Sequence, residues 1–395
     1  MLSCTDLDRV CSTLTKAFGT ITALFGGKSI ILAGDFAQLQ PPGRGHSLYS
    51  ASVGTAVSSR TESGQRAAIG KSVWHSFTTV VLLRSNMRQR GMSPADVAFR
   101  TALSNLRYAN CTDADIALLR TRVFSSQASS PVTNLDGFED VSIITARNAH
   151  RDAINRDGAE RYAQRTGKQL HYFYSHDSWG KTKDSASVRK AQKQYASISD
   201  PIRQGNAISQ RLQRVLWSLR PAMTEHHPGV LALCEGMPVI LKANEATEVG
   251  ATNGAAGHVE GWQARSDASG REYLQVLFVR LDRPPRDFQL DGLPPNVVPI
   301  TPMKRSVACT LPTDDIVLTI QREQVACLQN FAISDFTSQG LTRLKNVVHP
   351  RYCSNHQSLY TVLSRSSSLQ DTVVLEGLDV SKMRCGPSPA LLQEF

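Results

Sequence analysis

The sequence of 395 residues contains no apolar run of about 18 residues, so a membrane-spanning helix is not among the expected elements. It also lacks the basic start and apolar stretch of a cleaved secretion signal, and we expect an intracellular protein, nuclear if the source is eukaryotic. Hydrophobic residues make up 41% and charged residues 20%, which excludes a disordered or fibrous chain. The length predicts two to three domains at about 150 residues each.

The eight cysteines include no C-x-x-C pair, and no histidines follow at zinc-finger spacing. A structural zinc site is therefore not expected, and free thiols in a reducing compartment are the simpler interpretation. The histidine pair His226–His227 and the remaining histidines show no spacing typical of metal ligands. No metal-binding residue is assigned.

A phosphate loop of the form G-x-x-x-x-G-K-[S/T], whose backbone N–H groups hold phosphates, is also missing. Gly27-Lys28-Ser29 and Gly70-Lys71-Ser72 imitate its end, but Thr22 and Gln65 occupy the positions of the first glycine. The first fragment also precedes an expected strand, whereas a phosphate loop follows one. No strand ending in Asp-Glu, the usual Mg²⁺-holding pair, precedes Asp35. Both fragments are predicted to be turns.

Positive charge is in excess, with a formal net charge of +10. Between Lys181 and Arg220 nine basic and two acidic residues give +7, so most of the excess lies in one segment. Such a balance favours a polyanionic partner, nucleic acid above all. The segment either follows backbone phosphates or forms a solvated insertion, and both interpretations stay open.

Short apolar runs alternate with helical patterns, which predicts an α/β fold with a parallel, helix-covered sheet. Residues 168–228 are rich in Ser, Gln, Lys and Arg and predict an insertion, partly disordered, with one basic helix around Leu212–Leu219. The strands expected are 29–33, 79–83, 141–145, a β-rich module at 237–242, 273–281 and 316–320, and then 329–333, 344–349 and 372–376; the helices expected are 6–18, 94–107, one from about 148, and 359–364.

Six stretches, in chain order, resemble motifs of the Pif family of DNA helicases (RecD-like, superfamily one), especially the versions in Helitron transposons. Each string alone is weakly specific, but the ordered series covers almost the whole chain. The stretches are Gly34-Asp35-Phe36-Ala37-Gln38-Leu39-Gln40-Pro41 (family G-D-x-x-Q-L-x-P), Asn86-Met87-Arg88-Gln89 (N-M-R-Q), Thr145-Ala146-Arg147-Asn148 with Asn155 (T-x-x-N…N), Gly236-Met237-Pro238-Val239-Ile240-Leu241 with Asn244 and Asn253-Gly254 (G-M-P-V-x-L…N…N-G), Ala332 to Thr342 (A-x-T-x-x-K-S-Q-G-x-T) and Tyr360-Thr361-Val362-Leu363-Ser364-Arg365 (Y-V-A-L-S-R).

This resemblance implies RecA-like P-loop motor domains with parallel sheets, the first incomplete, and a small β-barrel inserted in the second. In the family an Asp-Glu-x-S-M string precedes the helix matching 6–18, and Met1-Leu2-Ser3 resembles its tail. The resemblance thus implies a chain truncated after the phosphate loop and acidic pair, through a gene start assigned at an internal Met or as a transposon relic. The domains implied are 1–85 (rear of motor domain one), 86–165 (start of motor domain two), 166–230 (basic insertion), 231–244 (strand of motor domain two), 245–324 (inserted barrel) and 325–395 (end of motor domain two).

ATP and Mg²⁺ are the cofactors that the resemblance implies, with an incomplete binding site in this chain. Gln38 would contact the γ-phosphate or its attacking water, and would otherwise be a surface loop residue. Arg88 and Arg365 would neutralise charge in the transition state, since a guanidinium fork suits phosphate, and would otherwise form structural salt bridges.

Three further residues are assigned to nucleotide binding. Asp35 would support Mg²⁺ through water or cap the turn at Gly34. Gln339 and Gly340 are expected in a strand-to-helix turn, near the nucleotide or as packing. The family Lys in this last motif is replaced by Thr337 and a usually polar residue by Phe336, which weakens the expected motor activity.

Single-stranded DNA is the expected partner, held along its backbone by hydroxyl, amide and basic side chains. No membrane and no protein partner is assigned, and a monomer is expected. The tryptophans Trp74, Trp179, Trp217 and Trp262 are stacking surfaces or, more simply, packing residues. The residues assigned to DNA are Thr145, Asn148, Lys242, Asn244, Thr337, Ser338 and Thr342.

The sequence is therefore interpreted as the rear portion of an ATP-dependent DNA helicase, inactive alone. Unwinding from 5′ to 3′ and roles in DNA repair, recombination and telomere maintenance are implied only by the family. Two alternatives stay open: a single-stranded nucleic-acid-binding protein without catalysis, and a non-functional transposon-derived fragment.

Overall fold

The computed structural model describes residues 2–43, 45–55, 60–124, 131–132, 134–180, 186–195, 207–312 and 316–394. The chain forms two compact units. Unit 1 contains the residues up to Ala146 and those from Ser338 onward, and unit 2 runs from Arg147 to Thr337. Within the described residues no helix combines the length and apolarity needed to cross a bilayer.

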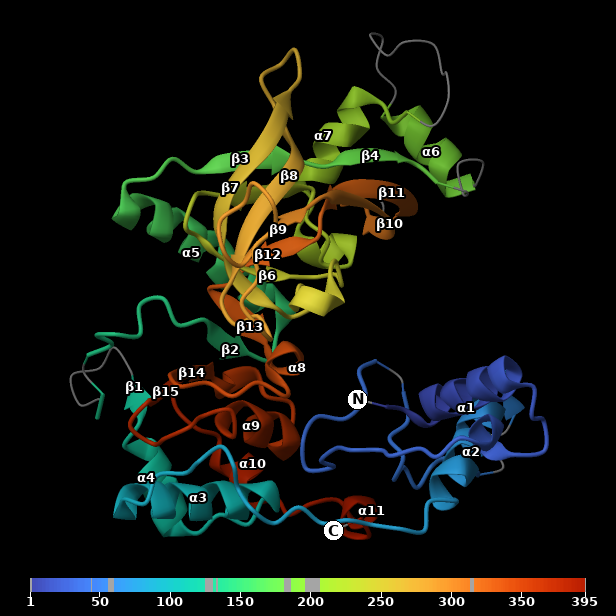
Figure 1. The fold of residues 1–395 in the computed structure, drawn as a ribbon, viewed down its shortest axis with the longest axis vertical. Helices are drawn as coiled ribbons and strands as arrows, with labels where there is room; N and C mark the ends of the chain where they lie inside the picture. The colour runs from blue at the N-terminus through green and yellow to red at the C-terminus, as the bar shows by residue number, and fades with distance from the viewer. Residues whose placement is uncertain are drawn as a thin grey trace. The chain divides into compact units, whose positions relative to one another are not determined.

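Unit 1 is built on a parallel sheet (Figure 1). Val348 pairs with Val374 on one side and Ile144 on the other, and all three side chains are fully buried. Parallel strands covered on both faces need apolar residues at successive positions, which is what these short runs supply. The α/β fold class expected from the sequence is confirmed. The strand order is β1 (Val123–Phe124), β15 (Thr372–Leu375), β14 (Asn346–His349) and β2 (Ile143–Thr145).

The helices of unit 1 begin where local capping favours it. Ser93, Thr112 and Asn355 each accept a hydrogen bond from a backbone N–H in the first turn of the helix that follows. Figure 1 shows α3, α4 and α9 on one side of the parallel sheet. The bounds are α1 (Cys4–Phe18), η1 (Leu24–Gly27), α2 (Glu62–His75), α3 (Pro94–Arg107), α4 (Asp113–Arg120), η5 (Pro350–Tyr352), α9 (His356–Leu363), α10 (Val380–Arg384) and α11 (Pro389–Leu392).

The spacing of Leu7, Val10, Cys11, Leu14 and Phe18 predicts that they share one face of the N-terminal helix, but the helix packs through a narrower face. Leu7 and Cys11 are buried, whereas Val10 and Phe18 are 41% and 50% exposed. Helix α2 packs closely on α1 at Gly70. Only glycine fits there, because a Cβ at this position would lie 1.8 Å from the carbonyl oxygen of Cys4. The predicted α1 face is right in its centre and wrong at Val10 and Phe18.

The strands predicted at 29–33 and 79–83 are wrong. Both segments are extended or irregular, and neither belongs to any strand ladder among the described residues. Most of their apolar side chains are exposed, with Ile31 and Leu83 each at 94%, whereas Ile30 and Leu32 pack partly buried against a hydrophobic cluster of unit 1. A β-strand is stabilised by hydrogen bonds to a neighbouring strand, so an apolar β-branched run without such a neighbour does not form one.

Unit 2 is mostly antiparallel sheet that curls into a nearly closed, barrel-like form (Figure 1). Strands β3, β5, β6 and β12 join it from outside the expected barrel at 245–324. One sheet runs β12 (Cys327–Gln329), β6 (Pro238–Leu241), β7 (Ala256–Ser266), β8 (Glu272–Leu281), β3 (His171–Tyr174), β5 (Val230–Leu233), with β9 (Val297–Ile300) on β8; the other runs β10 (Pro302–Thr310), β11 (Val317–Val325), β4 (His176–Trp179). The remaining elements are α5 (Asn148–Thr166), α6 (Ala186–Gln194), α7 (Gln210–Ser218), η3 (Pro221–Thr224), η4 (Thr247–Val249), β13 (Ala332–Ser334) and α8 (Asp335–Ser338), within which the chain passes back to unit 1.

The insertion predicted at 168–228 is more ordered than expected. Its described part forms β3, β4, α6 and α7 rather than one basic helix, while 181–185 and 196–206 of the basic segment lie outside the described residues. Trp179, Leu212 and Leu216 share one buried cluster with strands β10 and β11. Apolar residues too sparse to form a periodic pattern therefore still gather in three dimensions, and the prediction of a partly disordered segment with one helix is wrong here.

A buried ion pair ties the elements of unit 2 together. Arg322 on β11 donates from Nε and Nη2 to the two carboxylate oxygens of Asp177 on β4, each at 2.8 Å. The two side chains are 2% and 0% exposed. Asp177 also accepts from Gln213 of α7 at 2.9 Å, and Arg322 donates to the carbonyl oxygen of His227 at 2.8 Å. The pair thereby joins β4, β11, α7 and the segment before β5.

We expect Arg322→Leu to lower the free energy of unfolding of unit 2 by about 3–5 kcal/mol, because it leaves the buried Asp177 carboxylate uncompensated. The matched control is Arg280→Leu, which breaks a pair with Glu260 whose arginine is 55% exposed and is expected to cost about 0–1 kcal/mol. Denaturant unfolding followed by tryptophan fluorescence measures both. Equal losses in the two variants would contradict the assignment.

Candidate functional site

The loop that carries Asp35 and Gln38 is fixed to helix α9 by polar contacts inside unit 1. Gln357, which is buried, donates to the carbonyl oxygens of Phe36 and Gln38 at 2.7 and 3.0 Å. The backbone N–H of Leu39 donates to the hydroxyl of Thr361 at 3.2 Å. Residues more than 300 positions apart are thus joined, and the first and last motif-like stretches meet in one place.

The carboxylate of Asp35 is fully engaged. Arg107, at the end of α3, donates to its Oδ2 at 2.8 Å, and Gln38 Nε2 donates to the same oxygen at 3.1 Å. Its Oδ1 accepts from the backbone N–H of Ala37 at 3.0 Å, which closes the turn. Of the two roles expected for Asp35, turn capping is therefore observed directly, and an ion pair with Arg107 accompanies it.

Two arginines lie near Tyr360 without an acidic partner. Arg88 donates to the hydroxyl of Thr342 at 3.1 Å and to the carbonyl oxygen of Ser364 at 2.9 Å. Arg365 is 1% exposed and donates to the carbonyl oxygen of Thr361 at 2.8 Å and to the hydroxyl of Ser364 at 2.9 Å. Among the described residues no carboxylate forms an ion pair with either guanidinium, so the structural salt bridges considered from the sequence are not present there.

The electrostatic surroundings of this arginine cluster (Arg88, Arg107 and Arg365 around Tyr360) follow from burial and like charge. Burial, and then the nearby Arg88, lower the pKa of Arg365 to about 10, while Tyr360 and Asp35 oppose them. Burial also lowers the pKa of Arg88. Burial acts to lower the pKa of Arg107, but Asp35 and Tyr360 outweigh it and the pKa is raised. Arg88 and Arg365 are thus the cations with charge left to neutralise.

The remaining nucleotide-binding candidates lie after the short helix α8. The backbone turns at Ser338–Leu341, where the N–H of Leu341 donates to the carbonyl oxygen of Ser338 at 3.1 Å. Gly340 has φ of +84°, which favours glycine. Gln339 and Gly340 therefore occupy a turn between a helix and β14, not a strand-to-helix turn, and this detail of the prediction is wrong. Thr342 is brought to Arg88, as described above.

The residues assigned to DNA are divided by burial and by unit. Thr145 and Ser338 are fully buried, so neither side chain lies on the surface of unit 1 in this conformation. In unit 2, Asn244 accepts from the backbone N–H of Asn253 at 2.9 Å, which joins the two parts of its motif. Asn148 begins α5, where it accepts from Arg151 at 3.0 Å. The Thr337 and Ser334 hydroxyls share a hydrogen bond at 2.9 Å, and Ser334 also accepts from the backbone N–H of Thr337 at 3.1 Å.

The four tryptophans lie in packing contacts. Trp74 meets Phe36 edge-on at 5.6 Å, and Trp262 meets Phe173 at 5.3 Å. Trp179 is 3% exposed, and Trp217 donates to the carbonyl oxygen of Ser175 at 2.9 Å. The simpler of the two interpretations from the sequence, packing, accounts for all four.

Sequence reasoning missed Arg107, Gln357 and the position of Tyr360. Arg107 is the last residue of a correctly predicted helix, and no motif includes it. Gln357 lies one turn before Tyr360 on α9, so a search for polar residues on the buried face of that helix would have found it. Arg107, by contrast, is recognisable only once the fold brings it to Asp35.

The described residues do not fit a magnesium site. No three His, Cys, Asp or Glu side chains gather as metal ligands in the part of the chain that the structure describes. Both oxygens of Asp35 already accept hydrogen bonds from protein donors, one of them a cation. Carboxylate and water oxygens are the ligands that Mg²⁺ requires, and this donor set does not supply them.

No family model and no curated protein matches the sequence. The structure is similar to that of the Pif1 helicase from Candida albicans, with a TM-score of 0.61 and 18% identity, over 100% of this chain and 74% of that one. It is likewise similar to Bacteroides Pif1 in complex with ADP-AlF3 and ssDNA, with a TM-score of 0.61, 18% identity and 72% of that chain. Bacteroides Pif1 bound to ssDNA gives 0.58 and 18% over the same share. The fold is therefore that of the RecA-like Pif1 helicases.

We expect Thr361→Val to leave the buried N–H of Leu39 without an acceptor, at a cost of about 1–3 kcal/mol. Hydrogen exchange at the Leu39 amide is the measurement, and exchange should become faster than in the parent. The control is Thr101→Val, which makes the same nearly isosteric change at an exposed position of α3. It removes a hydrogen bond from the Thr101 hydroxyl to the carbonyl oxygen of Val97 in the same helix, at 3.1 Å. Unchanged exchange at Leu39 would show that the loop is held to α9 by other contacts.

Proposed function

We propose that this chain is the rear portion of an ATP-dependent DNA helicase of the Pif type, in the lineage found in Helitron transposons. Its fold is shared with Pif1 helicases, one of which is in complex with ADP-AlF3 and ssDNA. The six motif-like stretches in order support the same assignment. ATP is the proposed nucleotide and single-stranded DNA the proposed partner.

The observation that carries the proposal is the pair of arginines without acidic partners. Arg88 and Arg365 lie close enough for Arg88 to lower the pKa of Arg365, and hydroxyls and backbone carbonyls orient both. Placing two guanidinium groups together is unfavourable unless an anion joins them. Phosphate suits a guanidinium fork, and charge develops on phosphate in phosphoryl transfer. The proposed roles of both are to neutralise that charge.

Catalysis by this chain alone is not part of the proposal. The sequence contains no phosphate loop, and the described residues do not fit Mg²⁺. The exposed apolar runs at 29–33 and 79–83 fit strands that need further strands beside them. We propose that such strands come from a motor-domain segment that also carries the phosphate loop and an acidic pair. The 5′ to 3′ polarity, an intracellular location and the DNA-maintenance roles rest on family resemblance.

The second candidate is a single-stranded nucleic-acid-binding protein without catalysis. The net charge of +10 favours it, and so do the cations of unit 2 described below, which form no ion pair with an acid among the described residues.

The third candidate is a non-functional fragment. Exposed apolar side chains such as Val80 and Val81, at 79% and 77%, favour it. A cooperative thermal transition in solution favours the binding protein over the fragment, whereas aggregation on purification favours the fragment.

We expect the purified chain to bind oligothymidylate with an affinity that falls steeply with salt. We also expect it to show no DNA-stimulated ATP hydrolysis. In a fusion with an upstream segment that carries a phosphate loop and an Asp-Glu strand, hydrolysis should appear. There Arg88→Ala should lower kcat by about 10³-fold or more, because an arginine that neutralises transition-state charge contributes on that order.

The matched control is Arg90→Ala, two residues away, whose exposed guanidinium donates only to the carbonyl oxygen of Met87 at 3.0 Å. It should leave kcat within about twofold of the parent fusion, since exposed surface substitutions rarely affect a site. DNA-stimulated hydrolysis by the unfused chain would show that these residues build a complete phosphate grip. Absence of any binding to single strands would contradict the proposed DNA partner.

A further inference from the structure

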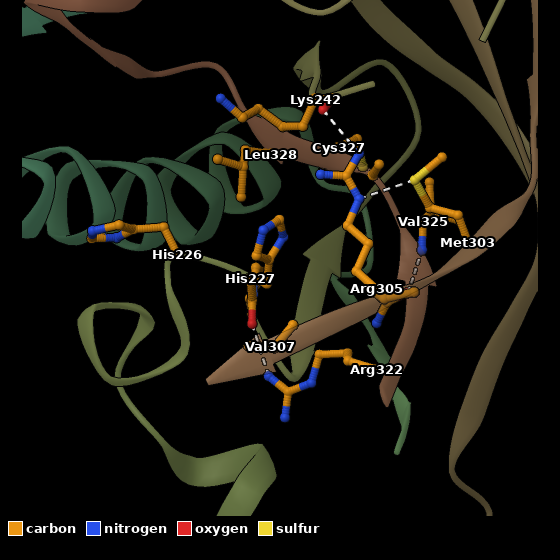
Figure 2. Close-up of a pocket in the computed structure, with 13 residues that line it drawn as sticks. His226, His227, Lys242, Met303, Arg305, Val307, Arg322, Val325, Cys327 and Leu328 are labelled. Atoms are coloured by element: carbon orange, nitrogen blue, oxygen red, sulfur yellow. Dashed lines mark hydrogen bonds between the residues drawn. The ribbon is translucent and has the colours of Figure 1, made fainter. Parts of the chain in front are cut away.

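A small cationic cavity lies in unit 2. Its volume is about 30 Å³, and it is lined by residues of strands β10, β11 and β12 and by Lys242, which follows β6. Figure 2 shows Arg305 extending from its strand toward the backbone of Lys242, with the ring of His227 nearby. Lys242 directly follows β6, Arg305 lies on β10 and His227 precedes β5. The sequence assigned Lys242 to DNA, but neither Arg305 nor His227.

The charges around the cavity do not balance locally. Arg322, at its base, is neutralised by Asp177 as described above. Arg305 donates to the sulfur of Met303 at 3.1 Å and to the carbonyl oxygen of Lys242 at 3.4 Å. Among the described residues no carboxylate forms an ion pair with Arg305 or Lys242. Two cations therefore line one cavity without an anion.

Of the neighbouring acids, Glu225 acts on His227 and accepts a hydrogen bond from the backbone N–H of Ala308 at 3.2 Å. Asp152 of α5 pairs with Arg151 at 2.5 Å and with His226 at 2.9 Å. Burial, and then Arg151 and Arg305, lower the pKa of Lys242, which shows that its charged form is not compensated where it lies. The charge left over at this place is positive, and an external anion would relieve it.

The size of the cavity limits what enters. A water-sized guest needs about 10–15 Å³ on this measure, so about 30 Å³ admits roughly two oxygen atoms. That space suits the non-bridging oxygens of one phosphate and is too small for a nucleobase. A guanidinium fork such as that of Arg305 suits a phosphate oxyanion.

We propose that this cavity, formed by Lys242, Arg305 and His227, binds one phosphodiester group of a single-stranded nucleic acid. The chemistry of the guest, a phosphate oxyanion, follows from the cavity itself. Its assignment to nucleic acid rests on the proposed function. Arg305 and His227 thereby become binding residues of unit 2 alongside Lys242.

Proton uptake should accompany binding. Burial, and then Arg305, lower the pKa of His227, and Lys242 and Arg322 act in the same direction while Glu225 opposes them. His227 is therefore neutral near pH 7. A phosphate in the cavity counters the three cations and raises this pKa, so binding should tighten as the pH falls.

Two other titratable groups line the cavity. His226 pairs with Asp152 at 2.9 Å, and the Cys327 thiol on β12 stays protonated because burial raises its pKa to about 12. The control for the pH dependence is His258→Gln, an exposed histidine paired with Asp282 at 2.8 Å. His227→Gln should reduce the gain in affinity between about pH 8 and pH 6, and His258→Gln should not.

The central experiment measures fluorescence anisotropy of labelled oligothymidylate with the full chain over a range of salt concentrations. Arg305→Gln and Lys242→Gln should each weaken binding by about tenfold at low salt and lower the salt slope by about one, as for one lost phosphate contact. Lys304→Gln is the matched control: it is next to Arg305 on β10, but it is 68% exposed and lies 3.7 Å from Glu323. Its effect should stay within about twofold, as for an exposed charge.

Misfolding of the variants is tested by thermal melting. Because Arg305→Gln removes one of two adjacent cations, the melting temperature of unit 2 should be kept or raised. Inorganic phosphate should raise the melting temperature of the parent and not that of the Arg305→Gln, Lys242→Gln double variant. If the double variant both melts at a lower temperature and binds weakly, the loss of affinity comes from damage to the fold, and the proposal is overturned.

The outcomes separate this proposal from the proposed function. If the parent binds single strands and the cavity variants behave like Lys304→Gln, the cavity assignment is overturned and the proposed function stands. A second outcome is that the parent binds no single strand, while inorganic phosphate raises its melting temperature and Arg305→Gln abolishes that rise. The proposed DNA partner is then wrong, and so is the assignment of the phosphate to a nucleic acid. Polyglutamate and unlabelled oligothymidylate of equal charge are compared as competitors of the labelled strand. If polyglutamate competes as strongly, the proposal of a phosphodiester ligand is overturned in favour of an acidic protein.

Discussion

Cations brought together inside a protein need an anion, and among the residues that the structure describes two such groupings form no ion pair with a carboxylate. In unit 1, Arg88 and Arg365 lie near Tyr360, and in unit 2, Lys242 and Arg305 line one cavity. Each grouping is held by backbone carbonyls, a hydroxyl or a thioether rather than by carboxylates. Such neutral acceptors orient a guanidinium without cancelling its charge. The remaining positive charge is then available to a ligand, and phosphate is the anion that both geometries suit.

Contrast with the ion pairs of the same chain shows that this arrangement is selective. Arg322 and Arg107 each meet a carboxylate at 2.8 Å, and their contacts join elements of the fold. Arg322 connects β4 and β11, and Arg107 connects α3 to the loop of Asp35. Structural arginines are thus neutralised, whereas the arginines assigned to ligands are not. Arginine thus supports the fold where an acid lies beside it and is a candidate for ligand binding where no acid does.

Local patterns in the sequence predicted helices α1, α3 and α9 and strands β2, β14 and β15 of unit 1, because caps and apolar periodicity act over a few residues, but they missed helices α2 and α4. Pro94–Arg107 is predicted to the residue, and the strands ending at Thr145 and beginning at Thr372 are in place. The runs 29–33 and 79–83 carry the same local signal and form no strand, since pairing depends on a neighbour that no local pattern reveals. The reverse occurs in residues 168–228, where packing creates order that periodicity does not show.

The candidate site divides in the same way. Motif resemblance supplied Gln38, Arg88 and Arg365, since short strings preserve the identity of residues that face a ligand. It could not supply Arg107 or Arg305, which belong to no string and become recognisable only through distances across the fold. Whether a cation is free depends on the absence of an acid in space, and sequence order does not encode that absence. Charge balance in the folded chain therefore points to candidate residues that motif comparison leaves out.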